Sequence, residues 1–243
     1  MSRTWAEICA DPCLGEDPSH LPDPERALPA AWRDALAAGQ RQPHAALARS
    51  MTLDTALPTG ALDQLLHAPE LSSLTALSVA GPVLDVHGLR VLLASPVLRH
   101  LRALTLSGTV LGMAGGQALL STRLFDQIRS LTLARCALTD SFVQVLVANI
   151  QAEHLRALAL PGNGLTDQAA TAIASSRHLA RLEQLSLADN AITAAGARRL
   201  AASPELRRLQ VLDLAGCPIG RRGRQHLFYS NTLSKAVRAH YAD

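Results

Sequence analysis

Residues 182–192 read LEQLSLADNAI, and residues 209–219 read LQVLDLAGCPI. In both stretches aliphatic residues occupy the first, fourth, sixth and eleventh positions. The same pattern starts at residues 74, 101, 128, 155, 182 and 209, so every step is 27 residues without insertion or deletion. Another aliphatic residue follows 18 residues after each start, from Leu92 to Leu227. A fixed period of this kind identifies a repeat protein, in which each repeat packs on its neighbours.

Each repeat carries the signals of one strand and one helix. The alternation Leu-x-Leu predicts a short strand with one buried face. The stretch GARRLAAS at 196–203 predicts a helix with Ala197 and Leu200 on one side, and Pro204 follows it as a helix breaker. Because one repeat cannot bury its own apolar face, we expect the repeats to stack as an α/β solenoid. Such a solenoid is curved, with parallel strands on the concave face and helices on the convex face.

The repeats resemble the leucine-rich repeat family, and within it the ribonuclease-inhibitor-like class with a helix in every repeat. That family usually has Asn or Cys eight residues after each start. The matching positions here are Pro82, Thr109, Cys136, Asn163, Asn190 and Cys217. The first two depart from the pattern, which puts the side-chain ladder in question at the N-terminal end. The resemblance covers about residues 47–235.

The chain divides into four parts by pattern. Residues 1–46 form a Pro-rich segment with two possible short helices, at 5–10 and 30–38, which would cap the solenoid with Trp5 or Trp32 as anchor. Residues 47–73 are expected to be a degenerate first repeat, because Ser50 and Thr52 stand where apolar residues belong. Residues 74–235 hold the six regular repeats. Residues 236–243 are expected to form a C-terminal strand or cap, since exposed sheet edges need cover.

Composition and motifs favour a soluble protein without catalytic machinery. No apolar stretch reaches the roughly 20 residues that a membrane helix needs, and the start does not read as a secretory signal, so we expect a cytoplasmic protein. The four cysteines do not form a disulfide framework. No nucleophile, phosphate-binding or metal-binding motif is present, so we expect no enzyme, cofactor or metal. Only one of the 23 basic residues is lysine, a bias typical of GC-rich, bacterial coding.

A row of charges follows the repeat starts. Arg102, Arg129 and Arg156 occupy successive repeats, and neighbouring strands lie about 4.8 Å apart. Stacked like charges are unfavourable, so an acidic partner would relieve them, although the side chains could also splay into water. The outward strand positions are otherwise mostly small and neutral. The predicted partner-binding residues are Arg102, Arg129, Arg156, Thr105, Thr132, Glu183 and Asp213.

A second basic cluster lies near the end of the chain. Residues 198–243 contain nine basic and three acidic residues. The secondary basic patch predicted there consists of Arg198, Arg199, Arg221, Arg222 and Arg224. Binding of nucleic acid is one hypothesis for such a patch, and the scarcity of lysine argues against it. An acidic protein partner and a merely solvated face are the others.

Taken together, these features predict a monomeric, non-catalytic protein–protein interaction module that binds a partner through the concave face or its edge. Three alternatives stay open. The protein could be an inhibitor or immunity-type protein that occludes an enzyme. It could be a GTPase-activating-like regulator, since a helix-containing leucine-rich repeat family with that activity exists. It could also bind nucleic acid through the C-terminal arginines.

Overall fold

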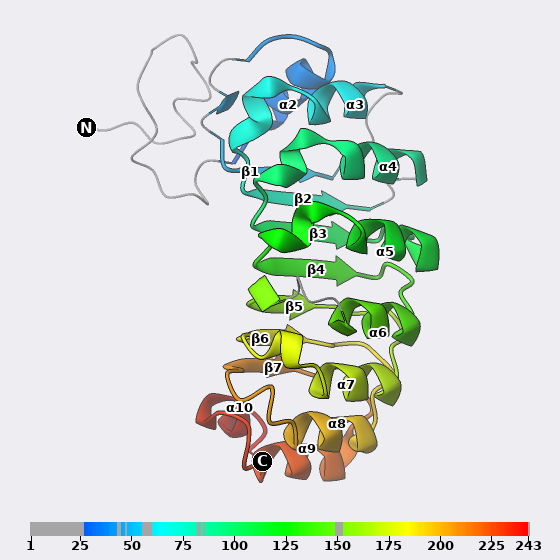
Figure 1. Ribbon diagram of the computed structural model, residues 1–243, viewed down its shortest axis with the longest axis vertical. Helices are drawn as coiled ribbons and strands as arrows, with labels where there is room; N and C mark the ends of the chain where they lie inside the picture. The colour runs from blue at the N-terminus through cyan, green and yellow to red at the C-terminus, as the bar shows by residue number, and fades with distance from the viewer. Residues whose placement is uncertain are drawn as a thin grey trace, which may run out of the picture. The chain divides into compact units, whose positions relative to one another are not determined.

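The computed structural model describes residues 27–42, 45–46, 48–54, 60–81, 84, 86–148 and 153–242. The chain forms two compact units, residues 1–104 and 105–243. In both units short strands alternate with helices along the chain (Figure 1). This alternation confirms the predicted α/β leucine-rich repeat solenoid.

Among its described residues, the first unit contains two neighbouring parallel strands and three α-helices. Its elements are α2 (Ala30–Ala37), β1 (Ser50–Leu53), α3 (Ala61–Leu66), the 3-10 helix η5 (Pro69–Ser73), β2 (Ala76–Ala80), α4 (Val86–Ala94) and the 3-10 helix η6 (Pro96–Arg99). Strand β3 (Ala103–Ser107) contains the division between the two units.

The register of the first repeat differs from the prediction. Ser50 pairs with Ala76 and Leu53 pairs with Val79, so the spacing is 26 residues instead of 27. Met51 and Leu53 are therefore the buried strand residues, while Thr52 is exposed. Counting back 27 residues from Leu74 had placed Ser50 and Thr52 at the inward positions, and that register is wrong by one residue. The reference residue for that count, Leu47, lies outside the described residues.

The residues before β1 cover its free side. Ala27 forms a parallel bridge with Ser50, and the Leu28 amide donates a hydrogen bond to the Ser50 carbonyl at 2.8 Å. Helix α2 is the helix predicted over 30–38, and it buries Trp32 and Leu36. This segment therefore closes the strand edge and anchors it with an aromatic ring. The other predicted helix, at 5–10, and its Trp5 lie outside the described residues.

The second unit continues the strand–helix alternation. Its elements after β3 are α5 (Gly112–Leu120), the 3-10 helix η7 (Arg123–Asp126), β4 (Ser130–Ala134), α6 (Asp140–Ala148), β5 (Ala157–Ala159), α7 (Asp167–Ala174), the 3-10 helix η9 (Arg177–Leu179), β6 (Gln184–Ser186), α8 (Ala194–Ala201), β7 (Val211–Asp213), α9 (Gly220–Phe228) and α10 (Lys235–His240). Strands β4 to β7 are parallel neighbours in chain order. Ser130 pairs with Ala157, Ala157 with Gln184 and Gln184 with Val211, which confirms the 27-residue step.

Asparagine side chains connect successive repeats behind the strands. Asn163 accepts hydrogen bonds from the amides of Cys136 (2.8 Å) and Leu138 (3.3 Å) in the preceding repeat. Its own amide nitrogen donates to the carbonyls of Leu133 and Leu160. Asn190 repeats the arrangement one step later, where it accepts from the backbone amides of Asn163 and Leu165, each at 3.0 Å. These asparagines satisfy buried loop groups that have no place in a regular ladder.

Serine hydroxyls form a second connection at the helix C-termini. Ser176 donates to the carbonyl of Val147, and Ser230 donates to the carbonyl of Ala201, each in the preceding repeat. Ser95 and Ser203 make the equivalent bonds to Leu66 and Ala174. The last helical carbonyls lack an intrahelical partner, so each serine satisfies one of them. These four serines share one column of the 27-residue pattern.

Residues 235–240 are helical, so the alternative of a terminal strand is wrong. Helix α10 begins at the cap Ser234, whose hydroxyl accepts from the Val237 amide. Tyr241 follows the helix and is buried, and its hydroxyl donates to the Leu212 carbonyl at 2.9 Å. That bond fastens the end of the chain to strand β7. None of the described helices is long and apolar enough to cross a bilayer.

Candidate functional site

The outward face of strands β4 to β7 presents two columns of side chains. Ser130, Ala157, Gln184 and Val211 form one column, and Thr132, Ala159, Ser186 and Asp213 form the other. The columns change in character along the unit. The β4 and β5 members are half-buried hydroxyls and methyl groups, whereas Gln184 and Val211 are exposed. Val211 keeps 50% of its surface exposed. Strands β6 and β7 thus hold the most accessible part of this face.

Two predicted site residues lie together at the entrance to β5 and β6. The Arg156 Nε lies 3.6 Å from the Glu183 Oε1, and both side chains are partly exposed. Arg156 also donates to the Leu155 carbonyl at 3.3 Å. An exposed pair of this kind adds little stability, but it places opposite charges side by side. Glu183 therefore offsets the like-charge contact expected for Arg156.

Arg129 is the positive neighbour on the other side of Arg156. The Arg156 amide donates to the Arg129 carbonyl at 2.7 Å, so the two residues stand at equivalent positions of adjacent repeats. Arg129 is exposed. Arg102 belongs to the first unit, where it is also exposed and its amide donates to the Thr75 carbonyl. Within the second unit the charge row consists of Arg129, Arg156 and Glu183.

The remaining predicted strand residues have different surroundings. Asp213 is held on both carboxylate oxygens: Oδ2 accepts from the Ser186 hydroxyl at 2.8 Å, and Oδ1 accepts from the Ala215 amide at 3.0 Å. Thr132 and Thr105 are half-buried on outward positions of β4 and β3. Asp213 and Glu183 are thus brought near the exposed end of the strand face, while the threonines lie on its more buried part.

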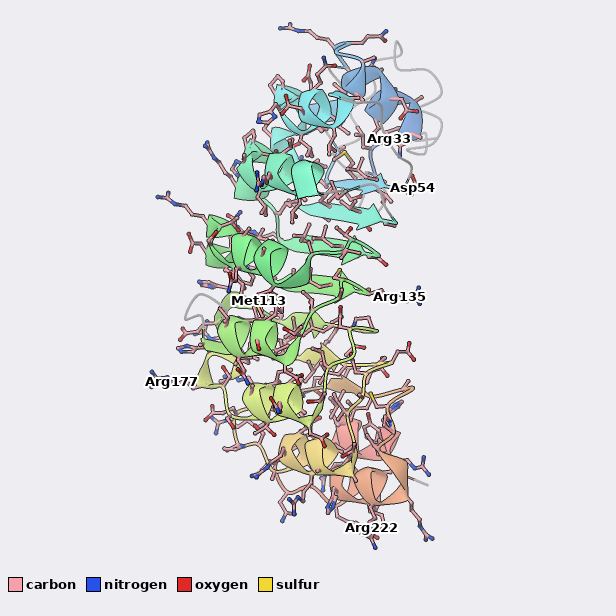
Figure 2. All side chains as sticks on the ribbon, turned by 90° about the vertical axis from the view of Figure 1, so that its right-hand side faces the viewer. Arg33, Asp54, Met113, Arg135, Arg177 and Arg222 are labelled. Carbon is pink, nitrogen blue, oxygen red and sulfur yellow. The ribbon has the colours of Figure 1, made fainter. Side chains whose placement is uncertain are left out.

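The C-terminal arginines all lie on two adjacent helices. Arg198 and Arg199 project from α8, and Arg221, Arg222 and Arg224 project from α9, all exposed. Figure 2 shows Arg222 on the outer side of α9. Sequence reasoning overlooked the aromatic residues that follow them. Tyr229 is 72% exposed and Phe228 is 37% exposed, and their rings meet edge to face at 4.8 Å. The sequence RRGRQHLFY at 221–229 already showed that two aromatic residues follow the arginines.

The described groups whose pKa is shifted take part in structural contacts. Burial lowers the pKa of Arg33, but its bonds to Asp34 and Asp54 outweigh burial and raise it overall (Figure 2). Burial raises the pKa of Cys136 to about 11, and it raises those of Cys217 and Tyr241. Both thiols donate to carbonyls of the preceding repeat. These groups therefore serve the fold.

Metal ligation finds no support in the part of the chain that the structure describes. There, no three His, Cys, Asp or Glu side chains gather closely enough to hold an ion. Cys136 and Cys217 are free thiols. Cys9 and Cys13 lie outside the described residues.

The repeats have counterparts among known proteins. A sequence profile described as "Leucine Rich repeat" matches residues 151–174 and 178–201. A chain of the yeast Rad7–Elc1 complex aligns with 83% of this chain at 20% identity and a TM-score of 0.51. That alignment covers 58% of the yeast chain, so this chain spans little more than half of its length. No curated protein sequence matches the chain.

Two further solved structures align less closely. A chain of the TLR13–ssRNA13 complex matches 79% of this chain at 19% identity with a TM-score of 0.44, over 33% of its own length. An internalin of Listeria monocytogenes matches 79% of this chain at 14% identity with a TM-score of 0.42, over 61% of its own length. The sequence period, the strand register, the profile match and the yeast fold agree. Residues 151–174 and 178–201 therefore match the leucine-rich repeat pattern, and the chain shares the fold of the yeast chain.

Proposed function

We propose that the protein is a non-catalytic protein-interaction module that binds its partner on the outward face of strands β5 to β7 and along its edge. One observation carries the proposal: Val211 is half exposed on this face, between polar neighbours. Gln184 pairs with it across the strands, and Asp213 follows on the same strand. Protein interfaces combine an apolar centre with a polar rim, and Val211 supplies an apolar contact among polar neighbours on this face.

The face is rigid before a partner arrives. Its strands are joined in a parallel ladder, and the Ser186–Asp213 bond fixes two outward side chains. A surface that is already ordered loses little conformational entropy on binding, which favours affinity. Small residues on β5 leave room for a partner's side chains to approach the sheet.

The edge of the face adds selectivity by charge. Arg129 is exposed, while Arg156 and Glu183 form an exposed pair beside it. We therefore propose a partner that sets an acidic group against Arg129 and polar groups against the pair. Charges at such a rim mainly steer association and reject wrong partners.

The surroundings of the titratable groups support a role without catalysis, since those with shifted pKa values hold carbonyls or carboxylates of the fold. The yeast relative is described as part of a complex of Rad7 and Elc1, which agrees with a partner-binding role. The proposal includes a cytoplasmic location, which cell fractionation with an antibody against the chain tests.

Capture experiments with two matched variants test the proposal. Val211→Arg places a charge on the strand face, and Val145→Arg places the same charge on helix α6, where Val145 is 46% exposed. Both variants should keep the melting temperature within about 2 °C of wild type, because exposed substitutions change stability little. Immobilised wild type, Val211→Arg and Val145→Arg are compared for proteins retained from lysate of the producing cells, identified by mass spectrometry.

We expect a protein retained by wild type and by Val145→Arg but lost with Val211→Arg. When that protein is purified, its dissociation constant for Val211→Arg should be about tenfold or more above that for wild type. Losing or blocking a central contact usually weakens binding by this much. Loss with Val145→Arg alone would move the site to the helices and refute the proposal. If the partner is an enzyme, its activity in the complex decides whether the module inhibits it.

A further inference from the structure

Helices α8 and α9 create a strongly positive surface, distinct from the strand face. Its members are Arg198, Arg199, Arg221, Arg222 and Arg224, called the basic surface below. Neither helix contains an acidic residue. Arg198, Arg199, Arg221 and Arg222 form no ion pair with any residue that the structure describes. The positive charge of these four arginines is therefore open to a partner.

Small residues bring the two helices, and hence their arginines, close together. A Cβ atom added to Gly223 of α9 would lie 3.4 Å from the Ala194 Cα and the Ala197 Cβ of α8. Leu200 and Leu227 point inward and are buried. All five arginines are exposed on this pair of adjacent helices, which Figure 1 shows side by side. Neighbouring like charges repel, so the cluster does not stabilise the fold.

An aromatic hollow adjoins the basic surface. A shallow depression of about 330 Å³ lies between the ends of α8 and α9, and Arg198, His226 and Tyr229 line it together with the Ser230–Thr232 turn. Tyr229 is largely exposed and its ring packs on Phe228. Arginine and tyrosine around a hollow are the residues that most often dominate protein-binding energies. The surface thus offers a hollow beside an aromatic ring as well as charge.

The chain itself contains a segment of complementary charge. Residues 1–26, the N-terminal acidic segment, hold six acidic residues and two arginines, a net charge of −4. The same segment carries the apolar side chains Trp5, Ile8, Leu14 and Leu21 among its acids. A segment that alternates acidic and apolar residues matches a surface that combines arginines with an aromatic hollow.

We propose that the basic surface binds the N-terminal acidic segment of a second copy of this chain, so that copies associate head to tail. The two contacting surfaces differ, so the interface is heterologous, and each bound copy still presents one free segment and one free basic surface. Association therefore grows with concentration. It is also salt-dependent, because exposed charges carry part of it.

Three full-length variants test the proposal. The surface variant carries Arg221→Gln, Arg222→Gln and Arg224→Gln, and the segment variant carries Glu16→Gln, Asp17→Asn and Asp23→Asn, so that each change removes charge without creating a new complementary pair. The control variant carries Arg123→Gln, Arg177→Gln and Arg181→Gln, which lower the net charge as much as the surface variant does, at exposed sites outside the basic surface. Figure 2 shows Arg177 projecting away from the protein. Circular dichroism and melting confirm that each variant folds as wild type does.

Sedimentation velocity over a concentration series measures association, with a reducing agent present so that Cys9 and Cys13 cannot cross-link copies. We expect wild type and control variant to associate, with a dissociation constant that rises about tenfold or more between about 0.05 M and 0.5 M salt. The surface variant and the segment variant should each remain monomeric. An equimolar mixture of these two should form a complex that stops at one copy of each, because only one complementary pair survives.

A wild type that stays monomeric throughout the series would overturn the proposal, and so would a mixture of the two variants that fails to form the 1:1 complex. Titration with a fluorescent single-stranded oligonucleotide covers the other class of polyanion. Tight oligonucleotide binding by a monomeric wild type, lost in the surface variant alone, would assign the basic surface to nucleic acid instead. Because purified chains alone are used, failure here leaves the strand-face proposal untouched.

Discussion

Asn190 offers the sharpest test of how the repeats are joined. Its Oδ1 accepts hydrogen bonds from the backbone amides of Asn163 and Leu165, each at 3.0 Å. Its Nδ2 donates to the carbonyls of Leu160 and Leu187, each at 2.9 Å. All four backbone groups belong to buried contacts. Replacing Asn190 with Ala removes every one of these bonds.

The cost follows from the groups left behind. Two buried amides lose their acceptor, at about 1–3 kcal/mol each, and two carbonyls lose a donor at a smaller penalty because each retains a second lone pair. We therefore expect Asn190→Ala to lower the free energy of unfolding by about 3–5 kcal/mol. Cys217 occupies the next position of the same column, and its thiol donates to one carbonyl at 3.1 Å. Cys217→Ala should cost about 1 kcal/mol or less.

Urea unfolding followed by circular dichroism measures both variants beside wild type, with the transition midpoint and slope fitted together. A matching slope means that the same surface unfolds, so the difference in midpoint reports the lost bonds. If Asn190→Ala lost no more stability than Cys217→Ala, the asparagine bonds could not be what joins the repeats.

Two further predictions concern the same column. Thr109 is buried, and its hydroxyl has no hydrogen-bond partner among the described residues, so Thr109→Val should raise stability by about 1 kcal/mol; a lower urea midpoint for the variant would contradict this. The pKa of Cys136 is raised to about 11 from its ordinary 9.0. The unfolded thiol therefore loses its proton first, and the thiol's contribution to stability, complete below pH 9, is lost as the pH rises from 9 through 11. Cys136→Ala should remove this part of the alkaline decline in urea midpoint, and identical pH profiles for variant and wild type would exclude the thiol as its source.

The regular repeats were predictable because their pattern has one physical cause. Every strand must bury the same two positions on the same side of the sheet, so Leu131, Leu158 and Leu185 recur at a constant step. The register of the first repeat was mispredicted because this repeat has one residue fewer. A shift of one residue exchanges the two faces of a strand. The buried Met51 could be assigned only when the pairing with Leu77 was known.

The candidate site was less accessible to sequence reasoning. The row of arginines was placed in the right column, but its charge balance depends on the reach of the Glu183 side chain toward Arg156. The exposure of Val211 could not be predicted from its position in the repeat, because Ala157 occupies the equivalent position on β5 and is half-buried. Near the C-terminus, helix α9 ends at Phe228, with Leu227 buried and Tyr229 exposed. The exposure of Tyr229 could be assigned only once the end of this helix was known.

The asparagine connections also bear on how such a chain can change its length. Asn163 and Asn190 each satisfy the repeat before them and present the same backbone amide to the repeat after them. A duplicated stretch of 27 residues that begins at one asparagine and stops before the next would therefore contain both the asparagine side chain and the backbone groups that the next asparagine bonds. Duplication or loss of one such stretch leaves no backbone group without its hydrogen bond where the repeats meet. The second unit can thus grow or shorten by whole repeats within a single genetic event.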